Sequence, residues 1–184
     1  KMGGLYRGVK LIAVEPVHIA LNDSGSCGVY ITPRNISKTS ADIGILVKLD
    51  KAETAEAKAV IYDTQGKPFM LRLNGKTDYF YLYNGLGDVV GLVDNSNQVV
   101  VRYQYNSWGK VTSTQDTSGV SLATLNPFRY RKYVYDPETG LYCLGSRYYD
   151  PEVGRFVNAD DTDVIFEKPQ ELYHKNLYVY CDNN

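Results

Sequence analysis

An internal repeat constrains the fold of this chain more than any other feature of the sequence. The stretch Tyr81-Leu82-Tyr83-Asn84-Gly85-Leu86-Gly87-Asp88-Val89 recurs in residues 103–111 with both tyrosines, the Asn, the second Gly and the Val retained. Self-similarity of this kind marks an architecture built from one repeated unit. The shared positions are Tyr83, Asn84 and Gly87, which correspond to Tyr105, Asn106 and Gly109.

A shorter unit of the same type follows. Its tyrosine, aspartate and glycine are Tyr135, Asp136 and Gly140, which recur as Tyr149, Asp150 and Gly154. Residues 62–66 share the outline, and from the sequence alone this match is equally consistent with coincidence.

The physical meaning of the repeat is a β-hairpin. Alternating Tyr, Val and Leu favour a strand whose side chains pack against the next strand. Asn or Asp followed by Gly favours a tight turn, because both residue types tolerate positive φ and the Asx side chain can bond the backbone ahead of it. Fourteen of the 17 tyrosines lie from Tyr79 onward. We therefore predict a curled sheet of hairpins in which the tyrosines pack between strands; stacking of their rings on sugars is the alternative.

The first part of the chain has a different pattern. Ile43, Ile45, Val47 and Leu49 alternate with other residues, which is typical of a half-buried strand. Four or five such strands precede residue 78, fewer than the roughly seven of an immunoglobulin-like sandwich. We predict a partial sandwich whose open face is covered by the later hairpins; without that cover the protein should self-associate. The predicted fold class is therefore all-β.

From residue 78 the motifs resemble the Rhs (YD-repeat) family and its repeat-associated core. They are Asn126-Pro127-Phe128-Arg129-Tyr130-Arg131, residues 135–142, Ser146-Arg147-Tyr148-Tyr149-Asp150-Pro151 and residues 154–160, in the family's order. Lys132 stands where that core usually has Gly, and Cys143 where it usually has Tyr. The resemblance implies a secreted or cell-surface protein whose hairpins form a hollow shell, with the rest of the shell and a carboxy-terminal effector as partners.

Residues 3–67 are similar to glycoside hydrolase family 2, through Gly3-Gly4-Leu5-Tyr6-Arg7-Gly8-Val9, Val14-Glu15-Pro16-Val17-His18-Ile19 and Gly28-Val29-Tyr30-Ile31-Thr32-Pro33. The catalytic barrel of that family would follow the matched stretch. The sequence thus predicts two domains, a family 2-like immunoglobulin-like fragment over residues 1–77 and the Rhs core over residues 78–184.

Few residues of this sequence indicate a catalytic, metal-binding or nucleic-acid-binding site. The formal charge of −1 lacks the basic excess of a nucleic-acid binder, and no apolar run is long enough to span a membrane. Cys27, Cys143 and Cys181 have no metal-ligand spacing, so we expect neither a metal nor a cofactor. The resemblance places a remnant of a self-cleavage centre at Asp160, with Arg147 or Arg155 as its partner; an Arg–Asp pair that only joins core strands is the alternative.

These observations favour a non-catalytic structural segment of a shell that encloses and presents an effector. Two alternatives belong to other classes. One is a carbohydrate-binding β module that uses exposed tyrosines and takes a glycan as its partner. The other is a truncated self-processing aspartyl peptidase core.

Overall fold

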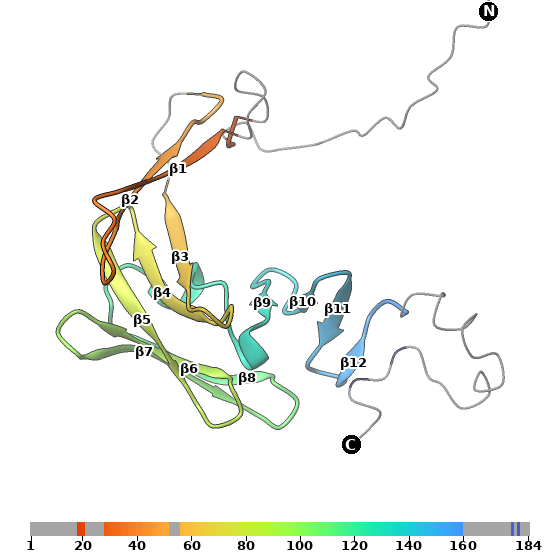
Figure 1. Cartoon of the computed structure of the whole chain (residues 1–184). Coiled ribbons are helices and arrows are strands. Elements are labelled where there is room, and N and C mark those ends of the chain that lie inside the picture. Colours follow the sequence, from red (N-terminus) through yellow and green to blue (C-terminus); the bar gives the residue numbers. More distant parts are fainter. Residues whose placement is uncertain (1–17, 21–27, 52–55, 160–177, 179, 181–184) are drawn as a thin grey trace, which may run out of the picture. The chain divides into compact units, whose positions relative to one another are not determined.

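A computed structural model describes residues 18–20, 28–51, 56–159, 178 and 180 (Figure 1). Almost every element in these ranges is a β-strand, which confirms the predicted all-β class. The chain divides into two compact units, residues 1–56 and 57–184. In the described ranges no helix is long and apolar enough to cross a membrane.

The described part of the first unit is an antiparallel hairpin. Strand β1 (Val29–Arg34) pairs with β2 (Asp42–Val47), and Ile19 forms a bridge with Leu49. Ile43, Ile45 and Val47 lie on this hairpin with exposed fractions of 54%, 51% and 40%. Cover by later hairpins would involve the second unit, so their expected burial stays a prediction. The described residues of this unit contain one two-stranded sheet, and the immunoglobulin-like sandwich is not confirmed.

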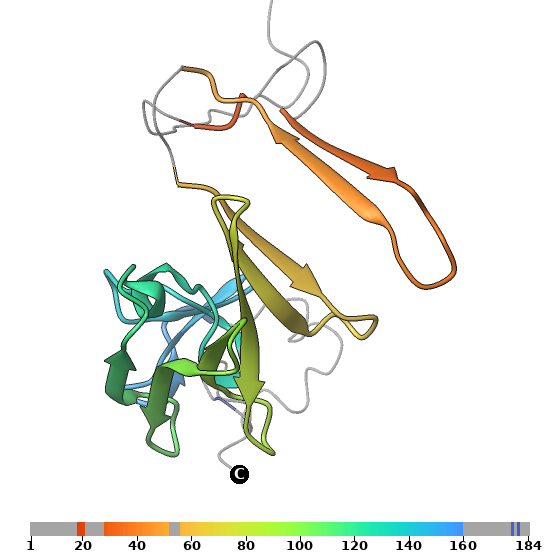
Figure 2. The same ribbon diagram turned by 90° about the vertical axis from the view of Figure 1, so that its left-hand side faces the viewer.

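The second unit is built around a six-stranded antiparallel sheet in simple meander order (Figure 2). Its strands are β3 (Lys58–Tyr62), β4 (Pro68–Leu73), β5 (Thr77–Tyr83), β6 (Val89–Asp94), β7 (Val99–Tyr105) and β8 (Val111–Asp116). The meander therefore crosses the domain boundary that the sequence predicts at residues 77 and 78. The reason is local, because β3 and β4 are joined by the same kind of turn that joins β5 to β6, β6 to β7 and β7 to β8.

That turn has one geometry at four places, which begin at Asp63, Asn84, Asp94 and Asn106. In each, the Asx Oδ1 accepts the backbone N–H groups two and four residues ahead, at 2.8–3.0 Å. The residue three positions ahead has positive φ, and it is Gly in three turns and Asn97 in the fourth. A register shift lies just before each Asx residue, so a bulge and a turn always occur together.

One face of the sheet carries the main core. Leu71, Leu92 and Val101 are fully buried there, and Tyr79, Tyr81 and Tyr103 are almost so. Helix α1 (Leu122–Leu125) contacts β7 and β8 and adds Leu122 to this core. This one-turn helix was not predicted, because four residues are too few for a helical period to be recognised.

A second, four-stranded sheet follows, with the strand order β12-β11-β10-β9. Its strands are β9 (Val134–Tyr135), β10 (Tyr142–Leu144), β11 (Arg147–Asp150) and β12 (Arg155–Phe156). A 3₁₀ turn, η1 (Tyr130–Lys132), leads into it from the first sheet. Tyr142 and Tyr149 are fully buried and form its core with Tyr130 and Phe156.

Candidate functional site

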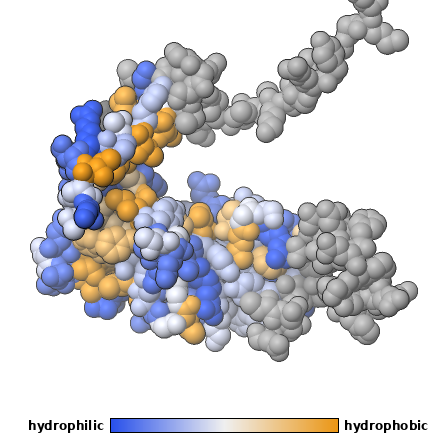
Figure 3. All heavy atoms as spheres, in the orientation of Figure 1, coloured by the Kyte–Doolittle hydropathy of each residue, from blue (hydrophilic) through white to orange (hydrophobic). Residues whose placement is uncertain are grey.

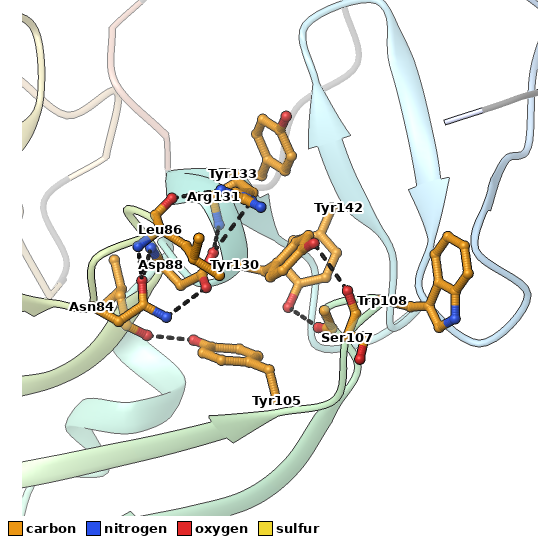
Figure 4. Close-up of polar contacts among 12 residues, drawn as sticks. Asn84, Leu86, Asp88, Tyr105, Ser107, Trp108, Tyr130, Arg131, Tyr133 and Tyr142 are labelled. Atoms are coloured by element: carbon orange, nitrogen blue, oxygen red, sulfur yellow. Dashed lines mark hydrogen bonds and ion pairs between the residues drawn. The ribbon is translucent and has the colours of Figure 1, made fainter. Parts of the chain in front are cut away.

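The turn of residues 106–110 lies at the junction of the two sheets, where three tyrosine hydroxyls bind it. Tyr130 donates to the Ser107 carbonyl (3.2 Å) and Tyr142 to the Gly109 carbonyl (2.8 Å) (Figure 4). Tyr149 donates to the Trp108 carbonyl (2.8 Å). Because these carbonyls are consecutive, the hydroxyls fix the position of the whole turn. The second repeat of the first sheet thereby anchors the second sheet.

Gly109 is needed at this junction for two reasons. Its φ is +85°, a conformation that disfavours any residue with a Cβ. A Cβ would also lie 2.4 Å from Tyr130 Cδ1, which is closer than packed carbon atoms approach. Gly87, at the same place in the first repeat, has a φ of +84° but no atom within 4 Å of a Cβ. Two glycines with one backbone conformation thus have different surroundings.

The same turn also contacts the turn that follows β11. The Trp108 ring lies against Gly154, where a Cβ would meet Trp108 Cε3 at 2.9 Å. Lys110 Nζ pairs with Glu152 at 2.7 Å, an exposed ion pair that contributes little to stability. The two repeat units identified in the sequence are therefore in direct contact.

The turn of residues 84–88 holds the connecting segment by its acidic residue. Asp88 is buried; its Oδ2 accepts from Asn84 Nδ2 (2.7 Å) and its Oδ1 from the Arg131 backbone N–H (3.0 Å). Arg131 Nε lies 3.6 Å from Asp88 Oδ1, and Arg131 Nη1 donates to the Leu86 carbonyl at 2.6 Å (Figure 4). Asp88 therefore fixes η1 to the turn between β5 and β6.

This attachment imposes an uncommon backbone on the connecting segment. Arg131 and Lys132 have φ values of +51° and +63°, which non-glycine residues rarely adopt. Lys132 is the position where the Rhs-like core usually has Gly, and the positive φ gives a physical reason for that preference.

Arg129 is buried among carbonyl groups and aromatic rings. Its guanidinium donates to the Asn126 carbonyl at 2.6 Å and to the carbonyl of Ala123 in helix α1. It also lies 4.2 Å from the centre of the Tyr103 ring. Among the described residues, carbonyl dipoles and a π-system balance this charge, and no carboxylate pairs with it. Arg129 fixes helix α1 and the connecting segment against the first sheet.

The aromatic rings form a continuous series from one sheet to the other. Neighbouring centroids are 4.4–6.4 Å apart along Tyr103, Tyr105, Tyr130, Tyr142, Tyr149 and Tyr180. Burial raises the pKa of Tyr81, Tyr105 and Tyr142 well above the usual tyrosine value, so these phenols stay protonated near neutral pH. Their chemistry is that of hydrogen-bond donors. The preferred interpretation of the tyrosines, packing between strands, agrees with this arrangement.

A cavity of about 640 Å³ opens beside the junction. It lies where β6 and β7 separate, since their pairing stops at Gly91 and Arg102. Tyr105 bridges the gap by donating to the Val89 carbonyl at 2.5 Å. Arg131 and Tyr130 line the cavity from the connecting segment, and Gln104 and Thr112 from the sheet.

The remaining residues predicted from the sequence are separate from this junction. Arg147 lies 3.7 Å from the centre of the Phe156 ring, and the exposed Arg155 pairs in register with Asp150 across β11 and β12. Asp160, their predicted partner, lies outside the described residues, as do Cys27 and Cys181. Cys143 is a half-buried free thiol. The described part of the chain holds no cluster of three metal-ligating side chains.

Sequence reasoning did not assign roles to Asp88, Arg129 or Tyr130. Arg129-Tyr130-Arg131 was nonetheless part of the quoted Rhs motif, so the resemblance marked the segment without explaining it. The repeat did not indicate a role for Asp88, because the corresponding residue of the second repeat is Lys110.

Comparison with known proteins gives the following matches. A family model described as Teneurin YD-shell matches residues 49–184. The tRNA3(Ser)-specific nuclease WapA of Bacillus spizizenii is 36% identical over 142 residues, which are 77% of this chain and 6% of that protein. The double-stranded DNA deaminase toxin A of Burkholderia cenocepacia is 41% identical over 70 residues, 38% of this chain and 5% of the toxin.

A similar fold occurs in the crystal structure of TcdB2-TccC3, with a TM-score of 0.56 and 20% identity over 84% of this chain and 8% of that one. The chain thus spans less than a tenth of each of these proteins. The comparisons do not support the resemblance of residues 3–67 to glycoside hydrolase family 2. The family model begins at residue 49, inside that stretch, and β3 belongs to the same meander as the later hairpins.

Proposed function

The chain belongs to the teneurin YD-shell family, and we propose that it forms part of the wall of a shell that encloses a carboxy-terminal effector. In this role the chain carries no catalytic step of its own. Its partners are the rest of the shell and the enclosed effector, and its location is outside the cell or on its surface.

The observation that carries this proposal is the junction of the two sheets. A wall that encloses a cargo must resist separation of its parts. Here three hydroxyl–carbonyl bonds and a continuous aromatic series join the sheets, and every buried side-chain nitrogen or oxygen in the described residues has a hydrogen-bond partner. Such fully satisfied polar networks make a packed structure rigid.

The relatives support the same role. One relative is named as a tRNA nuclease and another as a DNA deaminase toxin, and this chain matches only about a twentieth of each. A segment shared by proteins with such different activities is best explained by a structural task common to both.

The glycan-binding alternative has less support. The repeat tyrosines are buried or half-buried, and the hydroxyls of Tyr81, Tyr83, Tyr103 and Tyr105 all donate within the protein. Sugar stacking needs an accessible ring face, so these residues are better suited to packing. The self-processing alternative depends on Asp160 and remains a prediction.

Limited proteolysis of the purified chain tests whether the wall is one unit. We expect a resistant fragment that begins near Ala57 and contains both sheets, because the junction bonds them together. An early cut between Asp116 and Val134 that releases two separately stable fragments would contradict the proposal.

Enclosure needs a second experiment. Residues 49–184 replace the matching segment of WapA, and protease resistance of the whole chimera is compared with that of the parent. We expect resistance in the chimera and its loss in the Gly109→Arg form, with Gly87→Arg as the matched control. If the chimera is protease-resistant and Gly109→Arg leaves that resistance unchanged, the junction plays no part in enclosure.

A further inference from the structure

The β1–β2 hairpin has one face made only of apolar residues. In its register Val29 pairs with Val47, Ile31 with Ile45 and Pro33 with Ile43, and side chains of directly opposed residues lie on the same face of a sheet. These six residues are called the apolar strip below. The opposite face is mixed: Thr32, Arg34 and Asp42 lie there with Tyr30, Gly44 and the exposed Leu46.

The apolar strip is open to solvent. Ile31 is 66% exposed, Ile43 54%, Ile45 51% and Val47 40%. These fractions leave roughly 400 Å² of apolar surface uncovered, a size at which patches on monomeric proteins are often functional. Figure 3 shows apolar residues gathered on this hairpin. A two-stranded hairpin is only marginally stable in water by itself, so burial of this strip would stabilise the hairpin.

We propose that the apolar strip packs against the same strip of a second copy of this chain. The strip contains no charged or polar side chain, which disfavours a partner recognised through charge. Its three cross-strand pairs are self-complementary, because a two-fold axis near the Ile31–Ile45 pair places apolar pairs opposite apolar pairs. The result is a small two-layer sandwich of two hairpins whose outer faces carry the charged side chains of Arg34 and Asp42.

The small buried area is typical of a weak association. Two strips, with Val29 and Pro33 included, bury roughly 1,000 Å² in total, which is the lower limit for a specific interface. We therefore expect a reversible dimer that forms in the micromolar range or above, not an obligate one.

Sedimentation equilibrium of the full chain tests the proposal over about three decades of concentration around micromolar values. A reductant is present throughout, so that disulfides of the free thiol Cys143 do not mimic association. We expect the average mass to rise from 20.7 kDa toward twice that value. The Ile45→Lys variant should stay monomeric, and the Thr32→Lys variant, changed on the opposite face, should dimerise like the unaltered chain.

Mixing two variants distinguishes loss of the interface from loss of folding. Ile45→Lys and Ile45→Glu should each be monomeric alone and should associate when mixed, since opposite charges meet near the two-fold axis. A chain that is monomeric at every concentration, or that loses association equally in Thr32→Lys, would overturn the proposal. So would an Ile45→Lys variant with reduced, concentration-independent stability, because that result means that another part of the same chain covers the strip.

Discussion

Replacing Gly109 by alanine should destabilise the protein much more than the same change at Gly87. Both glycines have φ near +85°, and a residue with a Cβ costs about 1–2 kcal/mol in the left-handed region. At Gly87 this is the whole penalty, because a Cβ there meets nothing within 4 Å.

At Gly109 the new Cβ would lie 2.4 Å from Tyr130 Cδ1, so the ring or the turn must move. Overpacking of this kind costs about 1–3 kcal/mol, and loss of the bond from Tyr130 to the Ser107 carbonyl adds about 1 kcal/mol. We therefore expect Gly109→Ala to cost at least about 2 kcal/mol more than Gly87→Ala.

Urea unfolding followed by far-ultraviolet circular dichroism measures this difference. With an m-value of about 2 kcal/mol/M, the midpoint of Gly109→Ala should lie about 1 M below that of Gly87→Ala. The extra penalty should shrink when Tyr130 is already alanine, because the clashing ring is then absent. Equal costs at the two glycines, to within about 0.5 kcal/mol, would refute the reasoning that the turn is packed against Tyr130.

Three other measurements follow from the same structure. Arg129→Lys should cost about 2–4 kcal/mol in urea unfolding, because lysine cannot reproduce the forked donors or the stacking on Tyr103, and a near-neutral result would contradict the role given to Arg129. Lys132→Gly should stabilise the protein by about 1 kcal/mol by removing the cost of positive φ, and the control Lys76→Gly, at a turn residue without positive φ, should not. Burial raises the folded-state pKa of Tyr81, Tyr105 and Tyr142, so their contribution to stability is complete below about pH 10 and is lost as the pH rises above it; tyrosinate absorbance should therefore appear in step with unfolding, and full ionisation of all tyrosines in a folded chain would contradict this.

The hairpins were predictable because their information is local. An Asx residue with a Gly three positions ahead and Tyr just before specifies a turn within six residues, as at Asn84 and Asn106. The turn that begins at Asp94 escaped prediction, because Asn97 replaces Gly at the positive-φ position and Val93 replaces Tyr. Residues 62–66, which the sequence left undecided, form the same turn and move the start of the meander to β3.

The junction could not be derived in this way. Asp88 and Arg131 are 43 residues apart, and no spacing rule connects them. The three hydroxyls that bind residues 107–109 come from three separate segments. Composition showed that tyrosines were abundant, but which carbonyl each hydroxyl binds depends on how the two sheets meet.

Each Asx turn carries its own acceptor, and this has a consequence for how such a gene can change. Because the side chain at the start of the turn satisfies the turn's own N–H groups, a hairpin needs no neighbour to define where its strands reverse. Whole hairpins can therefore be duplicated or deleted in the open reading frame, and the meander grows or shortens in steps of two strands. The segment 129–133 lacks this freedom, since its partners are scattered along the chain, and it marks the place where such growth must stop.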